Sequence, residues 1–409
     1  MLARMRAALR RLARFVAAAA GAILVALILL EILLRIGLYE ALPIPIEASI
    51  FTMDAPGKLR LRPNVDVRSR GGEWDVRYVT NASGLRDGER ESLRVGSWGE
   101  RLSAARQDVK SPWPRVAILG LGDSFTFGWG VPFEATYLIQ GERALLDETR
   151  RPAICIAAAV PGWGPTDELA WLRENWDDWA PSLLLLGFVA GNDFFDTMVG
   201  GARQFEVVEG LQIPKSRNRG GIAAIRAPLR RYSALYRAIA ALSPGVEMRL
   251  ATRGRQILHW PVNDIYRRIP PAETTAAIDS TLRVLDAIRA FASERGATFA
   301  VTVIPGRAQV HAEDFSLFKS RFGFADADLD MAAPQRALRG WADARGVPLL
   351  DLAPPMRAAA AADTTRLYFR NDSHWTPAGH ALAGRLVARF LIDRALVPAD
   401  SARGPADPG

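Results

Sequence analysis

Residues 115 to 128 read RVAILGLGDSFTFG, and this stretch decides the fold. Its first part, Val116 to Leu121, is a short apolar run, long enough for one buried strand and too short for a helix. The run ends at Gly122-Asp123-Ser124, where glycine permits a sharp turn. Because open α/β sheets bind ligands at the carboxyl ends of their strands, the hydroxyl of Ser124 is expected to face a binding site. Ser124 is therefore a candidate nucleophile.

Strand-like and helix-like segments alternate after this stretch. The expected strands are 115–121, 153–159, 182–189, 298–304 and 348–352. The expected helices are 134–148, 167–179, 273–294, 334–345 and one that begins at Pro377. The alternation predicts an α/β fold in which a parallel sheet is covered by helices on both faces.

The N-terminus predicts a transmembrane helix over residues 15–35. Residues 1–14 hold several arginines and no acid, and residues 15–34 read FVAAAAGAILVALILLEILL, apolar except for Glu31. About twenty apolar residues suffice to cross a bilayer. The arginine-rich end should stay in the cytoplasm, which places the rest of the chain in the periplasm or outside. A cleavable signal peptide is the alternative, but its apolar core spans only about 7 to 15 residues.

A linker and β-hairpin region is expected over residues 36–114. Residues 65–69 and 74–79 alternate with a period of two around Gly71-Gly72, which predicts a hairpin. The sequence NASGLRD follows at residues 81–87. A turn is its plain interpretation, and a supporting role for Arg86 near the mouth of the site is the other.

Composition excludes several classes of partner. The net charge of +8 comes almost wholly from scattered arginines without a basic, aromatic-bearing stripe, so no nucleic acid is expected. The single cysteine, Cys155, lies in an apolar run and is expected to be a buried small hydrophobe. Metal-ligand spacings such as His-Glu-x-x-His do not occur, so neither a metal nor a cofactor is expected.

Three more polar turns follow strand-like runs: VPGWG at residues 160–164, GND at 191–193 and DSHWTPAGH at 372–380. Together with GDSFTFG at 122–128, these blocks resemble those of the SGNH/GDSL hydrolase superfamily, in the same order. The resemblance implies a three-layer, flavodoxin-like hydrolase domain over residues 115–393. It also implies an oxyanion hole made by the backbone N–H groups of Ser124 and Gly162 and the side-chain amide of Asn192.

His374 is the predicted base among the four histidines. It lies in a polar turn, two residues after an acid and just before the helix that begins at Pro377. Asp372 would orient the imidazole and stabilise the imidazolium. Many superfamily members space the pair as Asp-x-x-His, where this chain has Asn371, so the acid is assigned to Asp372.

Other polar residues receive lesser roles. Asp123 and Asp193 are possible supporting residues of the site, since each adjoins a predicted site residue. His380 points into the last predicted helix and is expected to be structural.

The interval 194–271 is much longer than the about 2 to 6 residues of an ordinary βα connection and is expected to be a helical insertion or cap. Apolar residues recur at helical spacing over 229–242, with arginines nearby. Core packing is the plain interpretation of this pattern, and contact with a membrane surface or an anionic polymer is the other. The tail, residues 394–409, is expected to be disordered.

These features predict a membrane-anchored serine esterase that cleaves an O-acyl ester through an acyl-serine intermediate outside the cytoplasm. The substrate would be an acylated small molecule, lipid or polysaccharide. An O-acetyltransferase or other acyltransferase that modifies an envelope or extracellular polysaccharide would use the same residues, with a sugar hydroxyl in place of water. An inactive scaffold or binding module of an envelope assembly is the third alternative, and the intact set of site residues argues against it.

Overall fold

The computed structural model describes residues 2–38, 48–87, 116–149, 153–208, 210–215, 229, 233–242 and 261–397. The chain forms two compact units. One comprises residues 48–214 and 254–409, and the other comprises residues 1–47 and 215–253. We describe each unit by itself.

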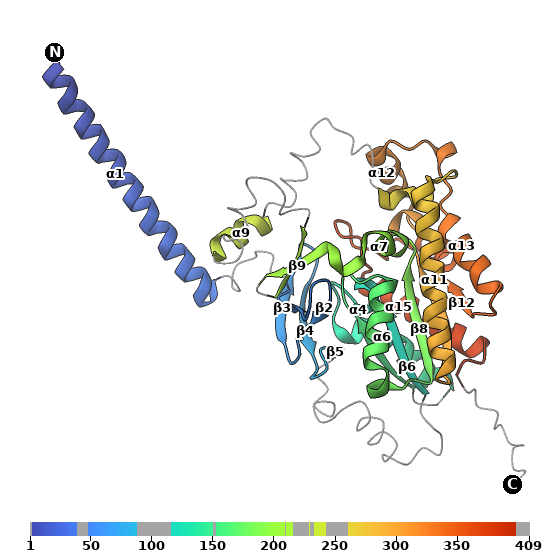
Figure 1. The fold of residues 1–409 in the computed structure, drawn as a ribbon. Helices are drawn as coiled ribbons and strands as arrows, with labels where there is room; N and C mark the ends of the chain where they lie inside the picture. The colour runs from blue at the N-terminus through green and yellow to red at the C-terminus, as the bar shows by residue number, and fades with distance from the viewer. Residues whose placement is uncertain are drawn as a thin grey trace, which may run out of the picture. The chain divides into compact units, whose positions relative to one another are not determined.

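The larger unit is built on a five-stranded parallel sheet (Figure 1). Its strands are β6 (Val116–Gly122), β7 (Ala153–Ala159), β8 (Leu183–Val189), β11 (Thr298–Ile304) and β12 (Leu349–Asp351). Their order in the sheet is β12-β11-β8-β6-β7. This is the flavodoxin-like strand order, in which the ligand site lies where the first strand meets the third. The predicted α/β fold is confirmed, and the expected site lies at the ends of β6 and β8.

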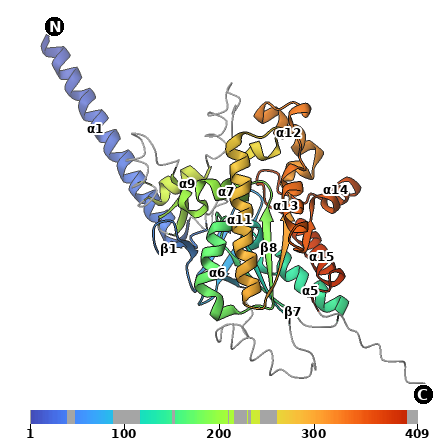
Figure 2. The same ribbon diagram turned by 45° about the vertical axis from the view of Figure 1, so that its right-hand side comes forward.

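Helices cover both faces of this sheet (Figure 2). On one face, α6 (Pro165–Trp179), α11 (Ala272–Glu294) and α13 (Ala333–Asp343) share an apolar core with the sheet. On the other face, α5 (Tyr137–Thr149), α14 (Ala353–Ala362) and α15 (Pro377–Asp393) form a second core. All seven residues of β8, LLLLGFV, are buried between these layers, as expected of a central parallel strand.

The sequence missed two helices of this unit, α12 (Ala312–Phe322) and α14. Helix α12 exposes large apolar side chains such as Leu317, which blurs its helical period. Helix α14 reads APPMRAAAAA, so it is specified mainly by the helix propensity of alanine and not by an apolar stripe. The other predicted helices begin and end within a few residues of their expected bounds.

The predicted hairpin belongs to the same unit. Strands β3 (Asp66–Arg70), β4 (Asp75–Thr80) and β5 (Arg86–Asp87) form an antiparallel sheet, and β1 (Phe51–Met53) pairs with β2 (Leu59–Leu61). Apolar side chains of these strands join the core that also contains α6 and α11. Residues 88–115 lie outside the described part of the chain.

The interval 194–271 is not a single helical insertion. It begins with α7 (Asp193–Val199), the 3₁₀ helix η4 (Gly201–Gln204) and an antiparallel hairpin, β9 (Phe205–Val208) and β10 (Leu211–Pro214), all in the larger unit. Helix α9 (Ala234–Leu242) belongs to the smaller unit, and η6 (Pro261–Tyr266) again belongs to the larger one. The interpretation of the interval as an insertion or cap does not predict this hairpin, whose strands are only four residues long.

The C-terminal tail also begins later than expected. Residues 394–397 are described, and Val397 is buried in the core beside α15. The predicted disorder of residues 394–397 is therefore wrong, and residues 398–409 lie outside the described part.

The smaller unit contains the apolar N-terminal helix. Helix α1 (Leu2–Leu33) continues into a short π-helix, η1 (Leu34–Leu38). The stretch Arg10–Gly37 is long and apolar enough to cross a membrane. Near its end, the unit adds α9, which packs against Leu34.

Candidate active site

The candidate site lies at the carboxyl ends of the neighbouring parallel strands β6 and β8. Strand β6 ends at Gly122, and Ser124 begins the short helix α4 (Ser124–Phe127). Asp123 caps this helix, because its Oδ1 accepts a hydrogen bond from the backbone N–H of Phe125 at 2.9 Å. Strand β8 ends at Val189, and Asn192 follows at the same edge of the sheet. The strand–turn–helix geometry thus presents Ser124 at the carboxyl end of β6, as the sequence predicts.

The structure brings Ser124, His374 and Asp372 together. His374 Nε2 lies 2.7 Å from Ser124 Oγ, and His374 Nδ1 contacts Asp372 Oδ1. The backbone N–H of His374 donates to the same carboxylate oxygen at 2.9 Å. In this arrangement His374 can take the proton of Ser124 Oγ while Asp372 fixes the imidazole tautomer.

Asp372 is held in its charged form. Burial acts to raise its pKa, but the hydrogen bonds and the positive charge of His374, with a contribution from Arg307, outweigh that effect and lower the pKa below its usual value. A charged Asp372 stabilises the imidazolium that forms when His374 accepts a proton.

The turn that holds His374 is fixed from both sides. Downstream, Thr376 Oγ1 caps α15 by accepting from the backbone N–H of Gly379 at 3.3 Å. Upstream, Glu73 accepts the backbone N–H groups of Arg370 and Asn371 at 2.7 and 2.6 Å. Glu73 belongs to the β3–β4 turn, and sequence reasoning missed it because nothing in a hairpin turn marks a distant partner.

Asn192 is oriented by two carboxylates. Its Nδ2 donates to Asp196 Oδ2 at 2.8 Å and to Asp123 Oδ2 at 3.2 Å, and Asp196 Oδ1 accepts from Gln204 Nε2 at 3.0 Å. Asp196 and Gln204 were missed. The spacing of Asn192 and Asp196, four residues apart at the start of a helix, is the signal that could have found Asp196.

Beneath this amide lies a group of buried acids. Asp123, Glu168 and Asp193 are buried, and burial is the main cause that raises the pKa of each carboxyl. Burial also raises the pKa of Asp196 to about 7. The predicted supporting residue Asp193 accepts the backbone N–H of Val189 through Oδ2 at 2.7 Å, so it ties α7 to the end of β8. Burial therefore disfavours the charged form of each of these acids.

Gly162 lies just beyond β7, the strand beside β6. Its φ is 89°, and a Cβ there would lie 2.2 Å from Gln212 Nε2 and 2.8 Å from Phe205 Cε2. Gln212 Nε2 also donates to the carbonyl of Pro161 at 2.9 Å. The β9–β10 hairpin therefore packs directly on this turn, and only glycine fits at position 162.

Comparison with known proteins agrees with this geometry. Residues 266–404 match the family model described as "SGNH hydrolase-like domain, acetyltransferase AlgX". The chain carries an SGNH hydrolase-like domain. The matched segment contains Asp372 and His374, whereas Ser124, Gly162 and Asn192 lie upstream of it. No curated protein sequence matches the chain.

Solved structures similar to this chain include those of two esterases and one lipase. The esterase EstA from Pseudoalteromonas sp. is 11% identical, with a TM-score of 0.36 over 69% of this chain and 99% of that one. A GDSL-like lipase from Bacteroides thetaiotaomicron is 13% identical, with a TM-score of 0.34 over 72% and 97%. An acetyl xylan esterase is 14% identical, with a TM-score of 0.36 over 69% and 100%.

Arg86, a possible supporting residue of the site, contacts the loop that follows α4. It is buried, and its guanidinium donates to the carbonyls of Phe127, Gly128 and Val131 at 2.6, 2.5 and 2.5 Å. Burial lowers its pKa to about 10. The segment before Arg86 is a turn, as its plain interpretation predicts, because Asn81 Oδ1 accepts the backbone N–H groups of Ser83 and Leu85 at 3.0 Å. Arg86 itself fixes the loop that leaves α4.

Of the other histidines that the structure describes, neither His311 nor His380 is hydrogen-bonded to Ser124. His380 is fully buried in α15, where its Nδ1 accepts the backbone N–H of Tyr137 at 3.2 Å and burial lowers its pKa to about 3. His380 is thus structural, as expected. His259 lies outside the described residues.

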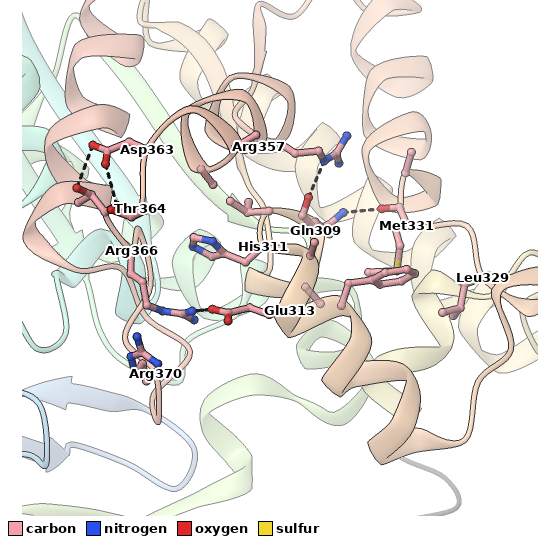
Figure 3. A pocket seen from close by; sticks show the side chains of 18 of the residues that line it. Gln309, His311, Glu313, Leu329, Met331, Arg357, Asp363, Thr364, Arg366 and Arg370 are labelled. Atoms are coloured by element: carbon pink, nitrogen blue, oxygen red, sulfur yellow. Dashed lines mark hydrogen bonds and ion pairs between the residues drawn. The ribbon is translucent and has the colours of Figure 1, made fainter.

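His311 lines a cavity of about 950 Å³ near α12 and α14 (Figure 3). Arg366 pairs with Glu313 across this cavity, and Arg357 donates to the carbonyl of Gln309. Ser124 and His374 are not among the lining residues, but Arg370, which precedes the His374 turn, is. The cavity therefore adjoins the support of the site and not its reacting atoms.

Proposed function

We propose that this chain is a membrane-anchored O-acetyltransferase that carries an acetyl group on Ser124 and passes it to a hydroxyl of an envelope or extracellular polysaccharide. The observation that carries the proposal is the hydrogen bond of 2.7 Å between His374 Nε2 and Ser124 Oγ, backed by Asp372, in an SGNH hydrolase-like domain. The acetyltransferase named in the matching family description favours acyl transfer over the hydrolysis that the sequence motifs place first.

The proposed first step forms the acyl-enzyme. His374 Nε2 takes the proton from Ser124 Oγ, which attacks the carbonyl carbon of the acetyl donor. Negative charge on the carbonyl oxygen is stabilised by the N–H groups of Ser124 and Gly162 and by the Asn192 amide. The tetrahedral intermediate then expels the donor oxygen, which receives the proton from His374.

The second step transfers the acetyl group. His374 takes the proton of an acceptor hydroxyl, whose oxygen attacks the acetyl carbonyl and releases Ser124 Oγ. The serine oxygen recovers the proton from His374, so the enzyme returns to its starting state. With a sugar hydroxyl as acceptor the product is an acetylated glycan, and with water it is acetate.

The N-terminal helix places this chemistry outside the cytoplasm in our proposal. The stretch Arg10–Gly37 can span a bilayer, and the arginines at its start favour a cytoplasmic N-terminus. A polysaccharide in the periplasm or beyond would then be the acceptor, and a membrane-proximal acyl carrier could be the donor.

A serine esterase is the second candidate, because the same residues would serve it. Ser124 is only partly buried, so water can compete with a glycan for the acyl-enzyme. The test supplies the full-length protein in detergent with an aryl acetate and a set of oligosaccharides, beside the Ser124→Ala variant.

Mass spectrometry of the oligosaccharides and assay of free acetate separate the candidates. Ser124-dependent acetyl esters on an oligosaccharide support the transferase. Release of free acetate that depends on Ser124 and is not reduced by any oligosaccharide supports the esterase. Release no faster than in the Ser124→Ala variant contradicts both and favours an inactive module.

A further inference from the structure

Glu31 is the one acid in the apolar run of residues 15–34, and it has specific partners. Its carboxylate accepts the backbone N–H groups of Ala234 and Leu235 at 2.8 and 2.9 Å, and the hydroxyl of Ser233 at 2.9 Å. Arg35 donates to the same carboxylate at 2.8 Å from one turn further along the helix. All of these contacts lie within the smaller unit.

These contacts complete the N-terminus of α9. The first N–H groups of a helix lack partners within the helix, and its N-terminal end attracts negative charge. Glu31 accepts two of these groups, and Ser233 Oγ accepts the next, from Tyr236, at 3.0 Å. A residue of the apolar N-terminal helix thus caps a helix about 200 residues away in the sequence.

The two helices also pack together beyond this cap. Ala234 and Ala238, four residues apart on α9, are buried together with Leu34 of η1. Small side chains at this spacing let one helix lie close to another. Helix α9 is therefore fixed at the end of the apolar helix that is distant from the arginine-rich terminus.

The opposite side of α9 is apolar and exposed. Tyr236 and Ile239 share that side. Ile239 is 56% exposed. Arg237 is the only charged residue of α9, and Arg226, Arg230 and Arg231 precede it in the sequence. A helix with this composition is unusual at a purely aqueous surface.

We infer that α9 is an interfacial helix, docked on Glu31 at the outer end of the membrane span, with Tyr236 and Ile239 in the headgroup region of the bilayer. The occupant of this apolar face is lipid, because the face is attached to a helix that can itself cross the membrane. The neighbouring arginines suit anionic headgroups. The inference rests on the proposed membrane anchoring and not on the proposed chemistry.

The hydrogen bonds from the N-terminus of α9 also explain how Glu31 is accommodated in an apolar run. An ionisable residue in a membrane segment is costly unless it is partnered. Cleavage of the N-terminal helix as a signal would remove the cap of α9 and expose Ala234 and Ala238. The mature protein should therefore keep residues 1–38.

The test places an environment-sensitive fluorophore on Ile239→Cys in the full-length protein, reconstituted in vesicles of phosphatidylcholine and phosphatidylglycerol. The native Cys155 is buried and should not react. The same label on Ile23→Cys, an exposed position of α1, marks the bilayer interior. Lipids with a quencher near the headgroup or deep in the acyl chain report the depth of each label.

We expect the label at 239 to be quenched most by the headgroup quencher and the label at 23 most by the deep one. In a Glu31→Ala background, headgroup quenching at 239 should fall about fivefold, the effect of losing a helix cap, while quenching at 23 stays. A label at 239 that no lipid quencher affects would overturn the inference, as would quenching at 239 that is unchanged in Glu31→Ala.

Intact mass of the protein from cells provides the second readout. A mature chain that begins after residue 31 would also contradict the inference. Acetyl transfer is not measured in these experiments, so failure of the proposed chemistry leaves their outcome unaffected.

Discussion

The candidate site contains two acids, Asp372 and Asp196, whose pKa values are shifted in opposite directions. On one side, Asp372 contacts His374, and its pKa lies below the usual value. On the other side, Asp196 contacts Asn192, and burial raises its pKa to about 7. Burial acts to raise the pKa of both acids. The hydrogen bonds and charge of His374 outweigh burial at Asp372, whereas the amide hydrogen bonds from Asn192 and Gln204 do not outweigh it at Asp196.

The comparison assigns separate tasks to the two sides of the site. The charged side is suited to moving a proton between Ser124 and His374. The side with raised pKa values is suited to holding the Asn192 amide, because Asp196 and Asp123 both accept hydrogen bonds from its Nδ2. One type of side chain therefore serves two roles through its surroundings.

The largest effect is expected on the charged side. Asp372→Asn should lower kcat for aryl acetate about 10,000-fold, because the imidazole loses its tautomer and its counter-ion. Asp363→Asn, at an exposed position in the same region, should change kcat less than twofold. Restoring the commoner spacing with Asn371→Asp in the Asp372→Asn background should not recover the rate. Recovery of kcat would show that an acid at position 371 can orient His374 and would contradict the assignment of this role to Asp372.

A smaller effect is expected on the side with raised pKa values. Asn192→Ala should lower kcat about 100- to 1,000-fold with little change in KM, because the proposed amide donor acts on the oxyanion. Steady-state kinetics on the aryl acetate measure both constants. An effect confined to KM would make Asn192 a residue for substrate binding and would remove it from the oxyanion hole.

Arg86 holds the loop that follows α4 through hydrogen bonds to three of its carbonyls. Arg86→Met leaves three buried carbonyls without their donor and should lower the free energy of unfolding by about 3 kcal/mol. The tryptophans of the described residues all lie in the larger unit, so tryptophan fluorescence in urea is a suitable measure of the unfolding of that unit. The matched control, Arg77→Met, breaks an exposed ion pair with Asp66 and should cost about 0.5 kcal/mol. Equal costs would contradict the support role of Arg86.

The smallest effect concerns stability and pH. Asp196 has a higher pKa when folded than when unfolded, so the unfolded chain releases this proton first as pH rises. The stability that its protonated form contributes is complete below about pH 4 and is lost by about pH 7. Asp196→Asn should remove about 2 kcal/mol of this decline, measured by urea unfolding at several pH values. The exposed control Asp177→Asn should leave the decline of the free energy of unfolding with pH unchanged. If Asp196→Asn also leaves this decline unchanged, the pKa of Asp196 is not raised in the folded protein.

The sequence predicts the sheet, and the candidate residues that the sheet brings together, for a physical reason. Strands such as 153–159 and 298–304 are buried on both faces, so their apolar runs mark them clearly. The polar turns that follow β6 and β8 must meet at one sheet edge, which brings Ser124 and Asn192 together. His374 is marked by its place just before a helix with a clear N-cap.

The supporting residues could not be predicted in this way. Glu73, Arg86 and Gln204 act on backbone or side chains far away in the sequence, and their spacing carries no period. The β9–β10 hairpin is also hidden, because its short strands lie in a long interval without a repeating pattern. Contacts of this kind depend on tertiary packing and become visible only in the folded chain.

The central claim is that an acyl group rests on Ser124 during turnover. Rapid acid quench of the full-length protein with aryl acetate, followed by mass spectrometry of its peptides, tests this most directly. The account predicts one acetyl group on the peptide that contains Ser124, its loss when a competent glycan is added, and its absence from Ser124→Ala. Turnover without that adduct, or an equal adduct in Ser124→Ala, would contradict the account.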